Sequence, residues 1–327
     1  MPTSVAPAGA AGSHAAVAPR AAFDVESTMK RVEVAIQGAI ECDEPLLRKM
    51  VSELVGAGGK RMRPRVALLA FDACGGSDPA GVIDAAAAFE LIHTASLVHD
   101  DIIDQSPLRR GKPTVHVAYG IPHAIVAGDF LFTQGFALSG SLPKDVIRVT
   151  ADACVRLAEG EVMEQRLLAE EVDEEAYLKI IVKKTAEPIR ACAMTGAILA
   201  GASRDVILAM GDYGLEIGIA FQIADDVLDI AGNPAETGKV VGQDAKQGVL
   251  TLPVGLGSEA ASFRELARTT NPDDLRQMLQ AAGAIDKARA VATKYAERAK
   301  SRLAALPSSA SKDALIALAD SVVKRKG

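Results

Sequence analysis

Apolar residues recur at intervals of three and four from about Phe23 onward, and this spacing predicts helices. One example is the series Val32, Ala35, Ile36, Ala39 and Ile40. Long alternating runs and Asn-Gly turns, which mark strands and hairpins, are nearly absent. The pattern therefore predicts an all-α fold.

Turn-forming residues divide this pattern into segments of roughly 12 to 25 residues, a length that suits a helix bundle. The breaks lie at 56–59, 75–79, 106–114, 120–122, 139–143, 201–204, 232–253, 271–274 and 307–312. No repeat or linker splits the chain, so we expect one multi-helix domain over residues 23–327. Residues 1–22 are rich in Ala, Pro and Gly, and we expect a disordered tail there. A cleaved targeting segment is the alternative, although a basic start and a leucine-like core are missing.

Composition narrows the function class. Hydrophobic residues make up 49% of the 327 residues, which provides for a sizeable core. The net charge of -6 argues against a general nucleic-acid binder. No segment reaches the roughly 18 uncharged apolar residues of a membrane span, so we expect no transmembrane segment. Because the cysteines (42, 74, 154 and 192) form no CxxC pair, zinc and dithiol chemistry lack support, and we expect a reducing, cytoplasmic location.

A first acidic cluster closes a helix that should begin near Gly81. Asp100 and Asp104 are four residues apart and share a helical face, with Asp101 beside them. Such carboxylates raise one another's pKa unless a cation neutralises them, and Mg²⁺ is their natural partner. A solvated acidic helix end is the alternative for one DDxxD pattern alone. Acids near a helix C-terminus oppose the helix dipole, however, and a basic loop follows at 109–112.

A second cluster repeats this device at the end of another apolar helix, with Asp225, Asp226 and Asp229. Acids at the end of a buried helix must be paired or metal-bound, and Lys239 and Lys246 follow in the next loop. Two acidic helix ends, each followed by bases, predict two helices that face across one cavity and hold a diphosphate through several Mg²⁺ ions. The pair is much more specific than either cluster alone.

Basic and polar residues elsewhere fit the same cavity. The glycine turn GGKRMRP (58–64) lets backbone approach an anion that its bases neutralise, although alone it would more often be a solvated turn. His93 lies seven residues before Asp100 on roughly the same helical face. A lone helical histidine is more often a core residue than a ligand. Gln222 lies one turn before the second cluster and could donate to a phosphate oxygen.

These motifs together resemble those of the trans-type polyprenyl diphosphate synthases, from about Val25 to the C-terminus. The similar segments are GGKRMRP (58–64), LVHDDIIDQSPLRRGKPTVH (97–116), GDFL (128–131), KTA (184–186), FQIADDVLDI (221–230) and GKVVGQD…TLP (238–253). The resemblance implies an isoprenoid-synthase-like bundle around a central cavity. It also implies head-to-tail transfer of the prenyl group of an allylic diphosphate onto isopentenyl diphosphate, with three Mg²⁺ per site and a homodimer.

The resemblance also implies a role for each matching residue. The residues for the diphosphate of isopentenyl diphosphate are Lys60, Arg63, His93 and Arg110. Those for the allylic diphosphate are Arg109, Lys184, Thr185, Gln222 and Lys239, among which Arg109, Lys184 and Lys239 stabilise the charge that develops as the C–O bond breaks. The Mg²⁺ ligands, direct or through water, are Asp100, Asp101, Asp104, Asp225, Asp226 and Asp229.

Three positions depart from the family pattern and concern details of the allylic site. Pro188 stands where the family often has Leu, and it should disturb the helix locally because it lacks an N–H. Glu164 stands where Gln is frequent, and Val249 where Lys is frequent.

Product length depends on the side chains that line the cavity below the first cluster. In the family, aromatic residues four or five positions before the first Asp stop elongation, whereas here Ser96 and Ala95 are small. We therefore expect a long product, roughly heptaprenyl to decaprenyl, and expect Ala95→Phe to shorten it. Deeper floors are Phe89, or Phe132 and Phe136, for which simple core packing is an equal alternative.

Other functions remain open at this point. Geranylgeranyl diphosphate is the alternative product, and a subunit of a heteromeric synthase is the alternative assembly. A terpene synthase would leave the isopentenyl-site bases unexplained, and a catalytically silent subunit would be expected to lose aspartates, all six of which are present.

Overall fold

The computed structural model describes residues 23–167, 174–231, 252 and 270–324. Within these residues the chain is a bundle of helices with one very short hairpin, so the predicted all-α fold is confirmed. The predicted tail, residues 1–22, lies outside the described residues, and the extent of the domain stays a prediction.

The N-terminal half carries the first acidic cluster at the end of α4. Its elements are α1 (Val25–Ala39), α2 (Pro45–Gly56), α3 (Met62–Ala73), α4 (Ala80–Ile103), β1 (Leu108–Arg109), β2 (Lys112–Pro113), α5 (Val115–Tyr119), α6 (Ile121–Ser139) and α7 (Lys144–Leu167). The start of α4 agrees with the predicted helix start near Gly81.

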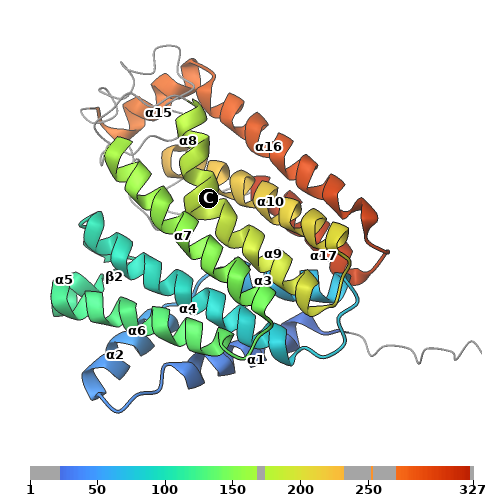
Figure 1. Cartoon of the computed structure of the whole chain (residues 1–327). Coiled ribbons are helices and arrows are strands. Elements are labelled where there is room, and N and C mark those ends of the chain that lie inside the picture. The colour runs from blue at the N-terminus through green and yellow to red at the C-terminus, as the bar shows by residue number, and fades with distance from the viewer. Residues whose placement is uncertain (1–22, 168–173, 232–251, 253–269, 325–327) are drawn as a thin grey trace, which may run out of the picture.

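The C-terminal half carries the second acidic cluster at the end of its longest described helix. Its elements are α8 (Glu174–Ile181), the π-helix η1 (Val182–Ala186), α9 (Glu187–Leu199), α10 (Arg204–Ala231), α15 (Pro272–Ala281), α16 (Ala284–Arg302), the 3₁₀ turn η2 (Leu303–Ala305) and α17 (Ala310–Val323). In Figure 1, α1 and α2 lie on one side of the bundle and α15 and α16 on the opposite side, with α7 and α9 between them.

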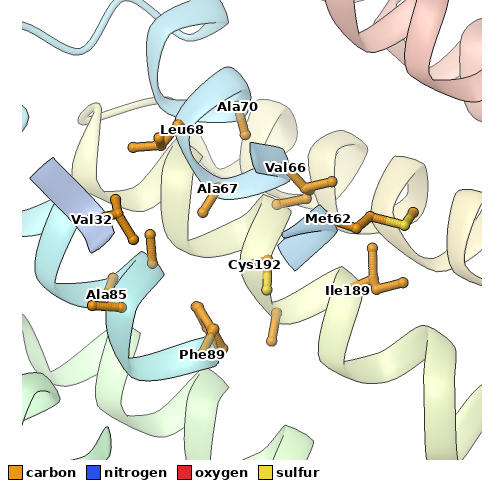
Figure 2. Close-up of a cluster of buried hydrophobic side chains, with 14 of the residues drawn as sticks. Val32, Met62, Val66, Ala67, Leu68, Ala70, Ala85, Phe89, Ile189 and Cys192 are labelled. Atoms are coloured by element: carbon orange, nitrogen blue, oxygen red, sulfur yellow. The ribbon is translucent and has the colours of Figure 1, made fainter. Parts of the chain in front are cut away.

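Small side chains bring the central helices close together. Figure 2 shows α3 side chains between those of α1, α4 and α9, with Val32, Ala67, Phe89 and Cys192 in one cluster. At Gly196 of α9 an added Cβ would lie 2.3 Å from the carbonyl oxygen of Ala67, so no larger residue fits there. α3 packs against both α4 and α9, and α9 packs against α10. This packing fixes the position of α4 relative to α10, the two helices that carry the acidic clusters.

Two described helices, α4 and α10, are long and apolar enough to cross a membrane when judged by length and composition alone. We expected no transmembrane segment from the sequence, because that prediction counted only apolar runs without charged residues. In the structure, 78% and 56% of the residues in their most apolar windows are buried inside the bundle. Core helices of soluble proteins pass the same test, so this is weak evidence for a span.

Candidate active site

The first acidic cluster lies in the last turn of α4 and is already crowded with charge. Asp104 caps the helix, and its N–H donates to the carbonyl oxygen of Asp100 at 2.8 Å. Burial, together with the nearby Glu161 and Asp104 carboxylates, raises the pKa of Asp100 to about 7. Burial also raises the pKa of Asp104. Both pKa values shift in the predicted direction, but burial contributes more than repulsion between the carboxylates.

Asp101 takes a different position from its neighbours. It is buried, and its carboxylate accepts from Arg109, with Nη2 at 2.7 Å and Nε at 2.9 Å from the oxygens. Successive helix residues differ by about 100° in direction, which explains why Asp101 and Asp100 do not face the same way. The structure thus places Asp101 as the partner that holds an arginine.

The hairpin that carries this arginine was not predicted from the sequence. β1 and β2 pair through only two residues each, so no alternating pattern exists to be recognised. Arg110 and Gly111 form the turn with φ of 52° and 74°, the left-handed values that two-residue hairpin turns require. The turn directs Arg110 back over Gly59, where an added Cβ would lie 3.0 Å from Nη2 of Arg110. The glycine of the basic turn therefore makes room for the guanidinium.

Lys184 is held by two glutamates of α7. Its Nζ lies 2.6 Å from Oε2 of Glu161 and also bonds Glu164, the residue that departs from the family pattern. Burial alone would lower the pKa of Lys184, but the Glu164, Asp100 and Glu161 carboxylates outweigh it and raise this pKa. Lys184 is also the cation that most opposes the rise in the pKa values of Asp100 and Asp104, ahead of Arg109.

The local fold explains how Lys184 reaches these glutamates. At Gly160 of α7 an added Cβ would lie 2.9 Å from the backbone nitrogen of Lys184, so only glycine allows this approach. Lys184 lies in the π-helix η1, where the N–H of Glu187 donates to the carbonyl oxygen of Val182, five residues back. Pro188 follows directly in the first turn of α9. The predicted disturbance near Pro188 is confirmed, and π-turns of this kind are frequent at functional sites.

The second acidic cluster ends α10 and meets the basic turn across the site. Asp225 lies 3.8 Å from Nζ of Lys60, which also lies 5.6 Å from the centre of the Phe221 ring. Asp226 is buried and accepts from the Tyr177 hydroxyl and from Gln222. Asp229 lies one turn further along α10. The predicted residues Lys239, Lys246 and Val249 lie outside the described residues.

Arg63 and His93 lie together in the wall of a pocket between α3, α4, α7 and α9. The Nδ1 atom of His93 is buried without a hydrogen-bond partner. Burial, Arg63 and the arginines of the hairpin lower its pKa well below the usual value, so the imidazole is neutral. Burial also lowers the pKa of Arg63. A buried guanidinium beside an unsatisfied imidazole is suited to an anion.

Arg61, to which sequence reasoning gave no role, fixes the basic turn. It has a left-handed φ of 45°, rare for a residue with a side chain, and bonds Glu33, Glu90 and the carbonyl oxygen of Val55. These contacts link α1, α2 and α4 to the start of α3 and so hold Lys60 and Arg63 in place.

The remaining pocket wall is mostly apolar. Besides Arg63 and His93, it consists of Phe89, Ile92, Thr150, Ala153, Cys154, Leu157 and Pro188. The α7 residues in this wall were missed by sequence reasoning, because nothing in a single helix shows which neighbour it faces.

The other residues that we expected to set product length do not line the pocket. Ala95 is fully buried, and Ser96 donates its hydroxyl to the carbonyl oxygen of His93 at 2.9 Å. Phe132 and Phe136 pack on each other, with ring centres 5.3 Å apart.

Carboxylate oxygens are ligands that Mg²⁺ prefers, and two groups of them end at this site. Within residues 23–167, 174–231, 252 and 270–324, no three acidic, histidine or cysteine side chains converge closely enough to hold a metal ion by themselves. Mg²⁺ usually binds one or two carboxylates and completes its shell with water and substrate phosphates. The donor set therefore fits Mg²⁺ that arrives with a diphosphate.

Comparison with known proteins gives a consistent result. A family model described as "Polyprenyl synthetase" matches residues 44–286. The short chain isoprenyl diphosphate synthase of Methanothermobacter thermautotrophicus is 41% identical, over 86% of this chain and 91% of that protein. The nonaprenyl diphosphate synthase of Mycobacterium tuberculosis is 34% identical, over 93% and 94%.

A solved structure agrees with these sequence relatives. The polyprenyl synthase of Caulobacter crescentus, in complex with calcium and isoprenyl diphosphate, superimposes with a TM-score of 0.87 at 35% identity and covers 94% of this chain and 100% of its own. The family model covers well over half of the chain, and both sequence relatives exceed 30% identity along most of their length. The chain therefore belongs to the polyprenyl synthetase family of prenyltransferases.

Proposed function

We propose that this prenyltransferase condenses isopentenyl diphosphate head-to-tail with an allylic diphosphate, depends on Mg²⁺, and releases an all-trans polyprenyl diphosphate. The pocket wall carries this proposal. Arg63 and His93 form the charged and polar part of this wall, and most of the other side chains that line the pocket are apolar. A charged head and a hydrocarbon tail would find matching surroundings there.

Mg²⁺ would be held at Asp100, Asp104, Asp225 and Asp229. Asp101 and Asp226, which the resemblance also implies as ligands, would instead orient Arg109 and Gln222. When bound, the metal ions neutralise diphosphate charge and make it a better leaving group. We expect about three ions per site, in keeping with the family resemblance. A calcium complex of the Caulobacter crescentus relative is consistent with a divalent ion at this site.

The side chains of this chain would divide the work of the reaction. Arg109 and Lys184, with Lys239, stabilise the charge that develops as the allylic C–O bond breaks. Arg63 and neutral His93, with Lys60 and Arg110, position isopentenyl diphosphate so that its double bond attacks the allylic carbon. A C–C bond forms, a proton leaves the new chain, and the departing diphosphate accepts that proton.

We propose a long product, roughly heptaprenyl to decaprenyl, because Ser96 and Ala95 are small at the positions where aromatic residues stop elongation in the family. A nonaprenyl diphosphate synthase is among the relatives. One observation favours geranylgeranyl diphosphate instead. Phe89 lines the pocket eleven residues before Asp100, about 16 Å along the helix, where it would close the tunnel early.

We also propose that the enzyme is a cytoplasmic homodimer. Exposed apolar side chains on α6 (Ile121, Ile125 and Val126) and on α7 (Val155 and Val162) offer a surface for a second copy. A heteromer with a dissimilar subunit is the alternative. Light scattering on the purified chain decides between a monomer and a dimer.

The first experiment is incubation of the purified chain with Mg²⁺, isopentenyl diphosphate and farnesyl diphosphate, followed by mass spectrometry of the products. A ladder well beyond geranylgeranyl diphosphate supports the open tunnel. Termination at geranylgeranyl diphosphate refutes the long product and supports Phe89 as the floor. If no product forms with allylic primers of several lengths, the chain does not act alone.

A further inference from the structure

Tyr177 of α8 reaches the second acidic cluster, and neither sequence motifs nor the proposed roles include it. Its hydroxyl donates to Oδ2 of Asp226 at 2.5 Å, and both side chains are buried. Hydrogen bonds to carboxylates are among the stronger ones in proteins, and burial strengthens them further. This bond joins α8 to the end of α10.

The same carboxylate continues the contact toward the allylic side of the site. Nε2 of Gln222 donates to Oδ1 of Asp226 at 2.9 Å. The Thr185 hydroxyl donates to Oε1 of Gln222 at 2.8 Å. Four side chains therefore form one hydrogen-bonded chain from α8 through α10 to the π-helix, in the order Tyr177, Asp226, Gln222, Thr185.

We propose that Tyr177 is a positioning residue for the allylic diphosphate half of the site. A carboxylate bonded at both oxygens cannot rotate freely, so Tyr177 fixes Asp226, and Asp226 fixes which end of the Gln222 amide faces Thr185. Gln222 and Thr185 are two of the residues expected to contact the allylic diphosphate, and Asp225 precedes Asp226 directly. This inference rests on the proposed function, because it names what the chain of hydrogen bonds serves.

Two isopentenyl-side residues, Arg63 and His93, lie outside this chain of hydrogen bonds. They line the pocket from α3 and α4. Loss of the Tyr177 hydroxyl should therefore weaken one substrate and not the other. A purely structural tyrosine would show no such difference.

The test compares two tyrosines that each lose only a hydroxyl. Tyr177→Phe keeps the ring, which packs among Ile180, Ile181 and their neighbours. The control is Tyr213→Phe, because Tyr213 is also buried on α10 but donates to the backbone oxygen of Leu315 at 2.8 Å, on α17. Both variants lose one buried hydrogen bond, so a general loss of stability affects both.

Binding is measured by calorimetry with farnesyl diphosphate and Mg²⁺ in the absence of isopentenyl diphosphate, so that no transfer occurs. For Tyr177→Phe we expect the Kd to rise about 10- to 100-fold, which is the range found when a side chain that orients a metal ligand is removed. The KM for the allylic substrate should rise with it, whereas the KM for isopentenyl diphosphate stays within about twofold. Tyr213→Phe should leave all three constants unchanged.

Tyr177→Phe with wild-type farnesyl diphosphate binding, and a lower melting temperature like that of Tyr213→Phe, would overturn the inference. If the wild-type protein itself binds no farnesyl diphosphate with Mg²⁺, the proposed function fails first. A double variant, Tyr177→Phe with Thr185→Val, gives a second measure. If Tyr177 and Thr185 act through one connected chain, the rise in Kd for the double variant should be smaller than the product of the two single rises. A rise equal to that product would show that the two residues act independently and would overturn the inference.

Discussion

Replacing Asp100 by Asn should make the metal-free protein more stable while it removes one of the proposed Mg²⁺ ligands. Asp100 is largely buried beside Glu161 and Asp104, and its pKa rises from 3.8 to about 7. At 1.36 kcal/mol for each pKa unit, ionising this carboxyl in the folded protein costs about 4 kcal/mol more than in the unfolded chain. The amide variant avoids that cost.

The sign of the pH dependence follows from the raised pKa. Between pH 3.8 and about 7 the folded protein holds a proton that the unfolded chain has lost, so wild-type stability falls as pH rises through this window. Asp100→Asn lacks this loss. The stability gap between the two proteins should therefore be full above pH 7 and should shrink as pH falls toward 4.

Calorimetric melting in EDTA at pH 5, 6, 7 and 8 measures this gap. With about 2.1 cal/mol/K per residue over 327 residues, 4 kcal/mol corresponds to about 6 °C at pH 8. Asp84→Asn, near the other end of α4, is the matched control and should show no such gain. Equal or lower melting of Asp100→Asn at pH 8 would refute the reasoning, as would a gap that does not change with pH.

Four further substitutions test the pocket and the lysine contact. Phe89→Ala should lengthen the product if Phe89 closes the tunnel, and an unchanged distribution in mass spectrometry would place the floor elsewhere. Ser96→Phe should shorten the product, because Ser96 shares a face with Phe89 and His93. Ala95→Phe, which the sequence alone led us to expect to shorten the product, should instead mainly destabilise the protein, because Ala95 is fully packed. Glu164→Gln removes one of the two carboxylates that bind Lys184 beside the first cluster, so Lys184 should compete more strongly with Mg²⁺ for Asp100 and Asp104. The Mg²⁺ concentration for half-maximal activity should rise about tenfold. Glu159→Gln, the control on the same helix, should change little, since its contact with a lysine is exposed.

The helices and the general place of the site could be predicted from the sequence. Helical spacing gave the start of α4 within one residue, and the four-residue spacing of Asp100 and Asp104 put them on one face. Periodicity is a local property, so it could not show that Asp101 turns to Arg109, or that Asp226 meets Tyr177 from another helix. Those contacts depend on how helices pack.

The hairpin and the Glu164 contact show two other limits. Two-residue strands leave no pattern, so only the positive φ of Arg110 and Gly111 reveals the turn. Glu164 was recognised as unusual, yet its partner Lys184 lies twenty residues away on a different helix. A departure from a family pattern shows where to look and does not show what the new side chain touches.

The π-helix at Val182–Ala186 has a consequence for how this protein can change in evolution. A π-turn holds one more residue than an α-turn, and one residue corresponds to about 100° of rotation about the helix axis. Deletion of a single residue there would restore regular winding and rotate α8 against α9 by about that angle. Tyr177 would then move away from Asp226 while α9 kept its packing on α3. When segments are exchanged between relatives, α8 and the π-turn should therefore be exchanged together, because the π-turn sets the rotation of α8 relative to α9.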